Sequence, residues 1–319
     1  MSLNENTFFS NLSKKNCFEK KPHIAVGVSG GPDSMALIYL LNKWVKFKKG
    51  KLSALVFDHG IRNDSKKESF IVKNTLEEFN IKTFIIRAKR KNLIKKNMAQ
   101  ARNNRFDGLI SFCKKNNILQ LFLGHHFDDN LETYLIRRLN GSNLEGLNSM
   151  KSITHYDKIQ ILRPLLSFNK TAILNYNKKN KILFINDPSN KDINFTRTKV
   201  RNFLLNKGYK KSVNTDFLYF KEKIPNYKKM IWELFLRTLV EVKKNKIKIN
   251  FNEIIKIDEL IIEKHILLIL QYFSIEKFRV KSSKINILLN LIKKPDFDSF
   301  NLSGIIIRKR SNFLIFFQI

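Results

Sequence analysis

The sequence predicts an α/β protein: a parallel sheet with its helices, followed by a smaller C-terminal α+β region. Up to about residue 205, short apolar runs alternate with longer amphipathic segments, an order typical of right-handed βαβ units. Near Lys207-Gly208 this alternation stops, and Ile, Lys and Asn dominate from there on. We therefore predict one domain at residues 1–210 and a second at 211–319.

The elements of the first domain follow from these runs in order. The predicted strands cover residues 24–28, 52–58, 82–86 and 119–124, and a further strand at 159–166 is broken by Pro164. The predicted helices cover residues 34–47, 65–79 (with Asp64 as its cap), 98–115, 128–138, 169–180 and 197–205. A polar loop is expected at 140–150 and a turn at 187–190.

The second domain gives fewer signals. Residues 216–242 are predicted to form a long helix that is interrupted near Pro225. Residues 301–319 alternate enough to predict a terminal hairpin that turns near Ser311-Asn312.

Composition narrows the function. The net charge of +33 favours a polyanionic partner such as a nucleic acid, although AT-rich coding would also produce a chain rich in Lys, Asn, Ile and Phe. The two cysteines, Cys17 and Cys113, lie far apart, which disfavours a disulfide framework and CxxC chemistry. Because no signal segment and no membrane-spanning run is recognised, we expect a cytoplasmic protein with no membrane partner.

The most informative motif is Ser29-Gly30-Gly31-Pro32-Asp33-Ser34, between a predicted strand and a predicted helix. Glycines let backbone N–H groups converge on one point, and the helix N-terminus adds partial positive charge there. The two serines add hydroxyl donors, and Asp33 is placed to hold Mg²⁺ beside a phosphate. The motif is not a Walker A loop, since no Gly-Lys-Ser/Thr follows. The alternative is an ordinary glycine turn in which Asp33 and Ser34 cap the helix.

A second constellation runs from Gly124 to Thr133. Asp129 and Glu132 lie three residues apart and so share a helix face, where carboxylates bind Mg²⁺ or an ammonium group. His126 precedes that helix, within reach of a phosphate or a base. The alternatives are helix capping by Asp128 and Asp129, a structural histidine, or a zinc site, although the spacing is not that of His-Glu-x-x-His.

Both motifs follow strands, and so does Asp58-His59-Gly60. Ligands of parallel sheets bind at the carboxyl ends of the strands, so the three motifs are expected to share one crevice.

Together these motifs resemble the tRNA(Ile)-lysidine synthetase family, whose Ser-Gly-Gly-x-Asp-Ser turn is the PP-loop of the N-type ATP pyrophosphatases. Weaker matches extend the resemblance over residues 24 to about 205; they are Asp58 to Arg62, Ala101-Arg102 with Arg105, Arg163 to Leu166, Asp187 to Asn190, and Arg197 with Arg201. The segment from Leu302 to the end is similar to the close of that family's smaller C-terminal domain. Longer members carry a further domain that this chain is expected to lack.

The resemblance implies a reaction. Such enzymes join L-lysine to C2 of the wobble cytidine in a tRNA(Ile) with a CAU anticodon, which changes the codon read from AUG to AUA. The cytosine O2 attacks the α-phosphate of ATP, pyrophosphate leaves, and the lysine ε-amine then displaces AMP.

The resemblance also assigns roles. ATP would be bound by Ser29, Gly30, Gly31, Pro32, Asp33 and Ser34. Asp33 would hold Mg²⁺, and Asp129 is a second possible ligand of this ion. Asp129 and Glu132 would grip the substrate lysine. The target cytidine or its phosphate would contact Arg102, Arg105 and His126. Arg197 and Arg201, four apart on one helix face, would stabilise the adenylate or the tRNA backbone, or else form a solvated face. The catalytic set is thus Asp33, His126, Asp129, Glu132 and Arg201.

Three other functions stay open. A PP-loop tRNA thiolase needs persulfide cysteines or an iron–sulfur cluster, for which two distant cysteines offer little. A PP-loop amide ligase leaves the charge of +33 unexplained. A basic RNA-binding protein with an inactive nucleotide fold would not need the intact Asp33, Asp129 and Glu132. The oligomeric state, monomer or homodimer, is not predicted.

Overall fold

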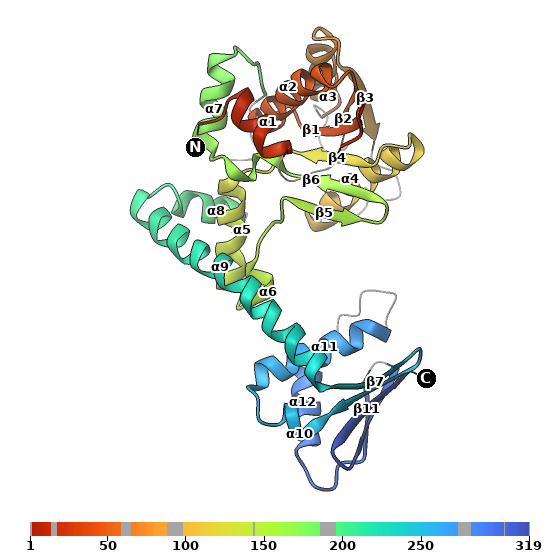
Figure 1. Ribbon diagram of the computed structural model, residues 1–319. Coiled ribbons are helices and arrows are strands. Elements are labelled where there is room, and N and C mark those ends of the chain that lie inside the picture. Colours follow the sequence, from red (N-terminus) through yellow and green to blue (C-terminus); the bar gives the residue numbers. More distant parts are fainter. Residues whose placement is uncertain are drawn as a thin grey trace. The chain divides into compact units, whose positions relative to one another are not determined.

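The computed structural model describes residues 2–13, 18–58, 65–87, 98–142, 144–185, 196–273, 282–302 and 304–318. The chain divides into two compact units, Met1–Phe220 and Lys221–Ile319 (Figure 1). The division falls inside helix α9 (Lys207–Thr238), and the boundary expected from the sequence, after residue 210, falls in the same helix.

The first unit is built on a six-stranded sheet with the order β3-β2-β1-β4-β6-β5. The strands β3, β2, β1, β4 and β6 pair in parallel, and β5 runs antiparallel to β6 at one edge. The strands are β1 (His23–Val28), β2 (Lys51–Asp58), β3 (Lys82–Arg87), β4 (Gln120–Leu123), β5 (Ile153–Tyr156) and β6 (Ile159–Leu162). The chain therefore leaves β1 toward β2 on one side and reaches β4 on the other, which makes the β1–β4 border the switch point where parallel sheets bind ligands.

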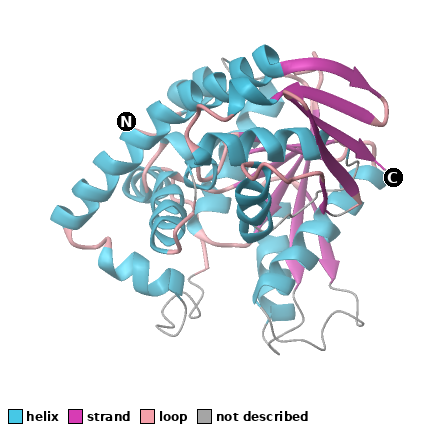
Figure 2. Cartoon of the chain, turned by 90° about the horizontal axis from the view of Figure 1, so that it is seen from below, coloured by secondary structure: helices cyan, strands magenta, loops and turns pink. Residues whose placement is uncertain are grey.

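Helices cover both faces of this sheet, and Figure 2 distinguishes them from the strands by colour. One layer holds α1 (Glu5–Ser13), α2 (Pro32–Phe47), α3 (Ser65–Glu77) and α7 (Lys170–Lys179), and α4 (Met98–Lys115) covers the opposite face. The remaining elements are α5 (Phe127–Leu139), α6 (Leu144–Leu147), the 3-10 helix η2 (Pro164–Ser167) and α8 (Thr196–Phe203).

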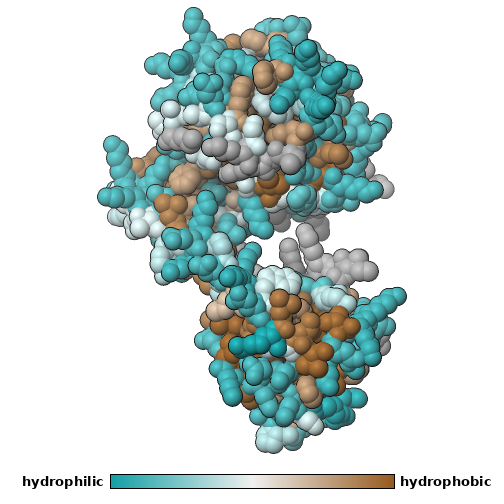
Figure 3. Space-filling model, viewed as in Figure 1, coloured by the Kyte–Doolittle hydropathy of each residue, from teal (hydrophilic) through white to brown (hydrophobic). Residues whose placement is uncertain are grey.

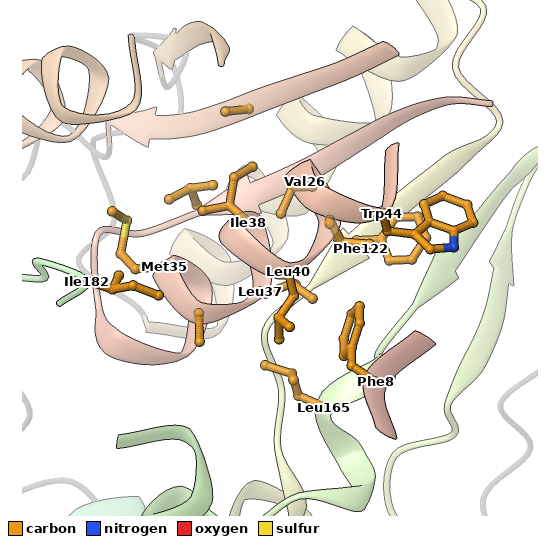
Figure 4. Close-up of a cluster of buried hydrophobic side chains, with 14 of the residues drawn as sticks. Phe8, Val26, Met35, Leu37, Ile38, Leu40, Trp44, Phe122, Leu165 and Ile182 are labelled. Carbon is orange, nitrogen blue, oxygen red and sulfur yellow. The ribbon is translucent and has the colours of Figure 1, made fainter. Parts of the chain in front are cut away.

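The main core lies under α2. Alternate β1 residues, Ile24 and Val26, point to this side of the sheet, while Ala25 between them packs toward α4. Figure 4 shows Leu37 and Leu40 of α2 between the sheet and Phe8 of α1. A separate cluster joins α5, α6, α8 and the start of α9; it comprises Leu131, Tyr134, Leu147, Val200, Leu204 and Phe217. This second cluster is what holds α8 against α5.

The second unit is an antiparallel five-stranded sheet with the order β7-β8-β11-β10-β9. Its strands are β7 (Leu239–Lys243), β8 (Lys246–Asn250), β9 (Ser299–Leu302), β10 (Ile305–Arg310) and β11 (Phe313–Gln318). Alternate strand residues pack against α10 (Phe251–Ile254), α11 (Glu259–Phe273) and α12 (Ser282–Ile292), so one face of the sheet forms the core.

The α/β class with a smaller α+β unit is confirmed, and the terminal hairpin is β10–β11 with its turn at 311–312. The long helix predicted at 216–242 is wrong at both ends: α9 begins at Lys207, and residues from Leu239 onward form β7. Pro225 lies inside α9 without ending it. Helix α1 and the edge strand β5 were not predicted from the sequence, and the short helix α6 lies in the segment predicted as a loop. Asp64 and residues 187–190 lie outside the described residues.

The surface seen in Figure 3 is mainly hydrophilic. Among the described residues, no helix is long and apolar enough to cross a membrane.

His265 of α11 gives the second unit a pH-dependent stability. It is fully buried, and its Nε2 lies 3.2 Å from Thr238 Oγ1. Burial lowers the pKa of His265 from 6.5 to about 4. The unfolded chain binds this proton at a higher pH than the folded chain does. Stability therefore falls as the pH drops below 6.5, and the loss levels off below the folded pKa of about 4.

We predict that the second unit loses about 2 kcal/mol of stability between about pH 7.5 and pH 5, and that His265→Gln removes most of this loss. The two tryptophans fall one in each unit, so a Trp44→Phe background leaves Trp232 to report urea unfolding of the second. His155→Gln, at an exposed position in the first unit, is the control. An unchanged pH dependence in His265→Gln would contradict the assignment.

Candidate functional site

The Ser29–Ser34 turn joins β1 to α2, and its shape requires glycine at position 30. Gly30 has a φ of +82°, and a Cβ there would lie 2.6 Å from Val72 Cγ2 of α3. Its carbonyl accepts a hydrogen bond of 2.9 Å from the Ile185 backbone N–H. Gly31 is the N-cap of α2, with a φ of −71°. The backbone of this turn is therefore fixed from both sides before any ligand binds.

The two serines have different roles within the turn. The buried Ser34 hydroxyl donates to the Gly31 carbonyl at 3.0 Å and accepts from the Ser29 backbone N–H at 3.2 Å. Ser29 is exposed, and its Oγ lies 3.3 Å from Ser34 Oγ. Ser34 thus shapes the turn, and Ser29 presents its hydroxyl to solvent.

The end of β4 presses directly on the start of α2. A Cβ on Gly124 would lie 3.1 Å from both the Asp33 carbonyl carbon and the Ser34 nitrogen. Since these neighbours are backbone atoms, any larger residue at this position would have to push them aside by a few tenths of an ångström, so the position favours glycine. This contact brings the residues after β4 beside the Ser29–Ser34 turn.

Asp33, in the first turn of α2, is paired with a lysine that the sequence analysis did not select. Lys170 Nζ, at the start of α7, donates to Asp33 Oδ1 at 2.6 Å and Oδ2 at 2.8 Å. His126 Nε2 lies 3.8 Å from Asp33 Oδ1. Asn169 is the N-cap of α7, so Lys170 is the first residue of that helix. This capping position was the only feature of the sequence that could have drawn attention to Lys170.

His126 and Asp129 begin α5. The His126 backbone N–H donates to Asp129 Oδ2 at 2.9 Å, in the manner of a capping box. The His126 ring is buried, and its Nε2 lies 3.5 Å from Asp129 Oδ2. Helix capping, one of the alternatives, is thus realised by Asp129, but its other oxygen remains available to a different partner.

That partner is Arg197 of α8. Arg197 donates from Nη2 to Asp129 Oδ1 at 2.8 Å and from Nε to Glu132 Oε2 at 2.7 Å. Arg201, one turn later, donates from Nε to Glu132 Oε1 at 2.8 Å. Glu132 is only 3% exposed and accepts from both guanidinium groups. The two arginines therefore share one face of α8, as their spacing predicted, and that face meets α5.

These ion pairs set the ionisation of the carboxylates. Burial by itself raises the pKa of Asp129, but His126 and Arg197 outweigh it and hold the pKa below its usual range. The pKa of Asp128 is lowered despite its burial, because Lys210 and the Lys170 backbone N–H donate to it. The hydrogen bond to Glu132 raises the pKa of Arg201. Asp128 and Asp129 are therefore charged near neutral pH.

The remaining residues predicted from the sequence make none of the contacts described above. Arg105 is half-buried on α4, and the Arg102 side chain is outside the described residues. Asp58 is buried at the end of β2 and accepts from Ser65 Oγ at 2.8 Å, while His59 to Arg62 are outside the described residues. Lys210 of α9, the partner of Asp128, was missed because nothing in the sequence connects it to α5.

Comparison with known proteins identifies the family of the first unit. Residues 2–208 match the family model of the PP-loop domain, which covers well over half of the chain.

The chain belongs to the PP-loop family.

Curated relatives resemble this PP-loop protein over somewhat less than two thirds of its length. It is 35% identical over 200 residues to the tRNA(Ile)-lysidine synthase of Orientia tsutsugamushi (strain Boryong), covering 63% of this chain and 45% of that protein. It is 38% identical over 200 residues to the tRNA(Ile)-lysidine synthase of Wolbachia pipientis wMel, covering 61% of this chain and 46% of the relative. The matched region thus spans slightly less than half the length of these relatives.

A solved structure shares the fold. The U34-tRNA thiolase NcsA from Methanococcus maripaludis, with its [4Fe-4S] cluster, superposes with a TM-score of 0.54 at 20% sequence identity. The superposition covers 68% of this chain and 80% of the thiolase.

The PP-loop site suits a metal that phosphates help to hold. In the described part of the chain, no group of three or more His, Cys, Asp or Glu side chains could hold a metal. The zinc site considered from the sequence is therefore not formed by the described residues. Mg²⁺, however, usually takes one or two carboxylates together with phosphate oxygens and water. Asp33, a hard oxygen donor at the N-terminus of α2, fits that role.

We predict that Gly30→Ala lowers the free energy of unfolding of the first unit by about 2 kcal/mol, because alanine disfavours positive φ and would clash with Val72. Gly31→Ala is the matched control, since its nearest neighbour is Ser29 Oγ at 3.6 Å. Its cost should stay below about 1 kcal/mol. Urea unfolding followed by Trp44 fluorescence in a Trp232→Phe background measures both, and equal costs would refute the proposed strain.

We predict that Glu132→Gln destabilises the same unit by about 2 kcal/mol, since it leaves Arg197 and Arg201 without their shared carboxylate. Glu77→Gln removes one partner of the exposed Lys73–Glu77 pair of α3 and should cost less than about 0.5 kcal/mol. The same unfolding assay compares the two. A loss for Glu132→Gln no greater than that of the control would mean that the buried carboxylate does not hold α8 to α5.

Proposed function

We propose that this protein is a tRNA(Ile)-lysidine synthase: it uses ATP to join L-lysine to C2 of the wobble cytidine in the CAU anticodon of tRNA(Ile), releasing AMP and pyrophosphate. The observation that carries this proposal is the meeting of two groups at the β1–β4 switch point. These are the PP-loop turn, and the Asp129–Glu132 carboxylates with their two arginines. Relatives that match 61–63% of this chain bear the name of this enzyme.

The reaction has two steps that balance. Cytosine O2 attacks the α-phosphorus of ATP, an O–P bond forms, and the bond to pyrophosphate breaks. The lysine ε-amine then attacks C2, a C–N bond forms, and the C–O bond to AMP breaks. The amine loses a proton overall, which a neighbouring carboxylate accepts. The wobble base lies in a single-stranded loop, so exposing its O2 costs little stacking energy.

The PP-loop turn holds the triphosphate. We assign the pyrophosphate to the backbone N–H groups of Gly30 and Gly31 at the start of α2, with the exposed Ser29 hydroxyl as a further donor. Pro32 opens the helix, and Ser34 acts by keeping the turn in shape, since its hydroxyl is already engaged within it.

Asp33 binds the magnesium of Mg²⁺–ATP in this proposal, and Asp129 is the second candidate ligand. When bound, the ion supplies Lewis-acid stabilisation of the phosphate charge. Lys170, which neutralises Asp33 in the structure, is suited to shift its ammonium to a phosphate oxygen when ATP binds.

The substrate lysine is assigned to Asp129 more directly than to Glu132. Asp129 keeps 14% of its side chain exposed, whereas Glu132 is nearly enclosed by Arg197 and Arg201. Glu132 therefore contributes by orienting the two arginines. Arg201 and Arg197 in turn stabilise the negative charge of the adenylate or the tRNA backbone. His126 and, from α4, Arg102 and Arg105 are assigned to the target cytidine.

The alternatives receive less support. A thiolase that uses an iron–sulfur cluster holds it through cysteine thiolates, but this chain has two cysteines. One of them, Cys113, is buried with its pKa raised to about 12. A PP-loop amide ligase leaves the net charge of +33 without a function, and an inactive RNA-binding protein would have no need for a preformed charged site. We place the reaction in the cytoplasm, where tRNA and ATP meet, with a monomer or homodimer as the acting species.

The test is incubation of the protein with ATP, radiolabelled lysine and total tRNA, followed by nucleoside analysis. Label in a cytidine derivative supports the proposal; ATP-dependent sulfur incorporation or no modification overturns it.

We predict that Asp33→Ala lowers lysine transfer by about a hundredfold or more, while tRNA affinity stays within about threefold. An equal loss of both would show that Asp33 does not act on ATP.

A further inference from the structure

We propose that the α8–α9 turn and the start of α9 form a binding site for an unpaired stretch of the RNA substrate, next to the reaction site. We call this site the α9 patch; its residues are Phe203, Lys207, Tyr209, Lys210, Lys211 and Asn214. The proposal rests on the proposed function, because it names where that function's RNA is held. All six residues lie in the first unit.

The patch contains a stacked and exposed aromatic pair. The rings of Phe203 and Tyr209 lie 4.6 Å apart at an interplanar angle of 7°. They are 45% and 52% exposed, respectively, although burial would stabilise both. Exposed rings beside positive charge are what proteins use to stack unpaired bases, without strong preference for sequence.

A hollow lies along the face of α9 that carries Lys207, Lys210 and Lys211. Its volume is about 350 Å³, its apolar floor is Phe127 and Leu131 of α5, and three lysines line it: Lys207, Lys210 and Lys211. Asn169 and Asn214 complete the lining. Three cations around a part-apolar hollow suit a phosphate with its attached nucleoside better than a neutral metabolite.

The charges of this hollow are mostly uncompensated. Lys210 pairs with Asp128, but neither Lys207 nor Lys211 makes an ion pair within the part of the chain that the structure describes. No acidic residue occupies the first turn of α9. Both free lysines are exposed, so a phosphate backbone can reach them without rearrangement.

The hollow also offers a hydrogen-bond acceptor. Asn214 Oδ1 is buried and accepts no hydrogen bond from any described residue. If the Asn214 side chain rotates toward the hollow, a ribose 2′-hydroxyl or an exocyclic base amine satisfies this oxygen, and single-stranded RNA supplies both.

The α9 patch is continuous with the candidate active site. Lys210 reaches Asp128, the neighbour of Asp129, and the Lys170 backbone N–H donates to the same carboxylate at 2.6 Å. RNA held on the patch therefore lies close to the α5 N-terminus, where His126 and Asp129 are assigned to the cytidine and the lysine. This proximity favours a role in presenting the nucleotides that flank the reacting base.

Salt titration of RNA binding tests the lysines. We expect Lys207→Gln/Lys211→Gln to weaken binding of tRNA and of an oligouridylate of about ten nucleotides by roughly tenfold at low salt, and to reduce the log–log salt slope by about 1 to 1.5. Affinity and slope equal to those of the unmodified protein would overturn the site.

The aromatic pair has a different signature. Phe203→Leu/Tyr209→Leu keeps apolar bulk in the turn but removes both rings, and it should weaken oligouridylate binding by about five- to a hundredfold without changing the salt slope. Unchanged oligouridylate affinity would mean that the rings only pack against each other.

The matched control lies at the other end of the strands. Phe47 is 76% exposed at the end of α2, with Lys48 Nζ 5.8 Å from its ring centroid and Lys49 next to it. Phe47→Leu/Lys48→Gln/Lys49→Gln should leave RNA affinity within about twofold, and an equal loss there would reduce the result to net charge.

The outcomes separate this site from the proposed function. Lysidine formation with unaltered RNA binding by the patch variants would overturn the site alone. Patch-dependent RNA binding without any lysidine formation would overturn the proposed function and leave the site standing.

Discussion

The close approach of Gly124 to the backbone of Asp33 and Ser34 is the contact on which the site depends. It brings the end of β4 against the start of α2 at the switch point of the sheet. Because the neighbouring atoms are backbone, the distance is set by the fold and not by side-chain adjustment. The phosphate-binding turn and the charged residues that follow β4 are therefore held together before any substrate arrives, which is the pre-organisation that electrostatic catalysis requires.

Around this contact the protein pairs its charges locally, even though the chain as a whole is strongly basic. Four carboxylates, Asp33, Asp128, Asp129 and Glu132, meet cations from the segment between α7 and the start of α9. Such pairs hold the carboxylates in their charged form and connect α8 to α5 through more than apolar packing. They also leave a route for exchange, since a phosphate can take over a cation such as Lys170 from its carboxylate at little electrostatic cost.

The excess positive charge of the chain has a general effect and, at the start of α9, a local one. The net charge of +33 favours binding of any polyanion through counterion release. At the start of α9 some of it lies near exposed aromatic rings and a hollow that adjoins the candidate site. General attraction and local recognition are thus separate properties, and only the second requires a particular arrangement of side chains.

The sequence by itself determined the α/β class, the order of the main strands and helices through residue 205 apart from α1, α6 and the edge strand β5, and the Ser29–Ser34 and Asp129–Glu132 motifs. These depend on local periodicity and on residue types at fixed spacing. It failed where tertiary contacts decide. Residues 239–242 look helical but pair with β8, since sheet hydrogen bonds outweigh their weak local preference. The partners Lys170 and Lys210 lie 137 and 82 residues from the carboxylates they meet. Nothing in a single sequence encodes such a distance; only the fold, by packing α7 against α2 and the start of α9 against α5, brings these charges together.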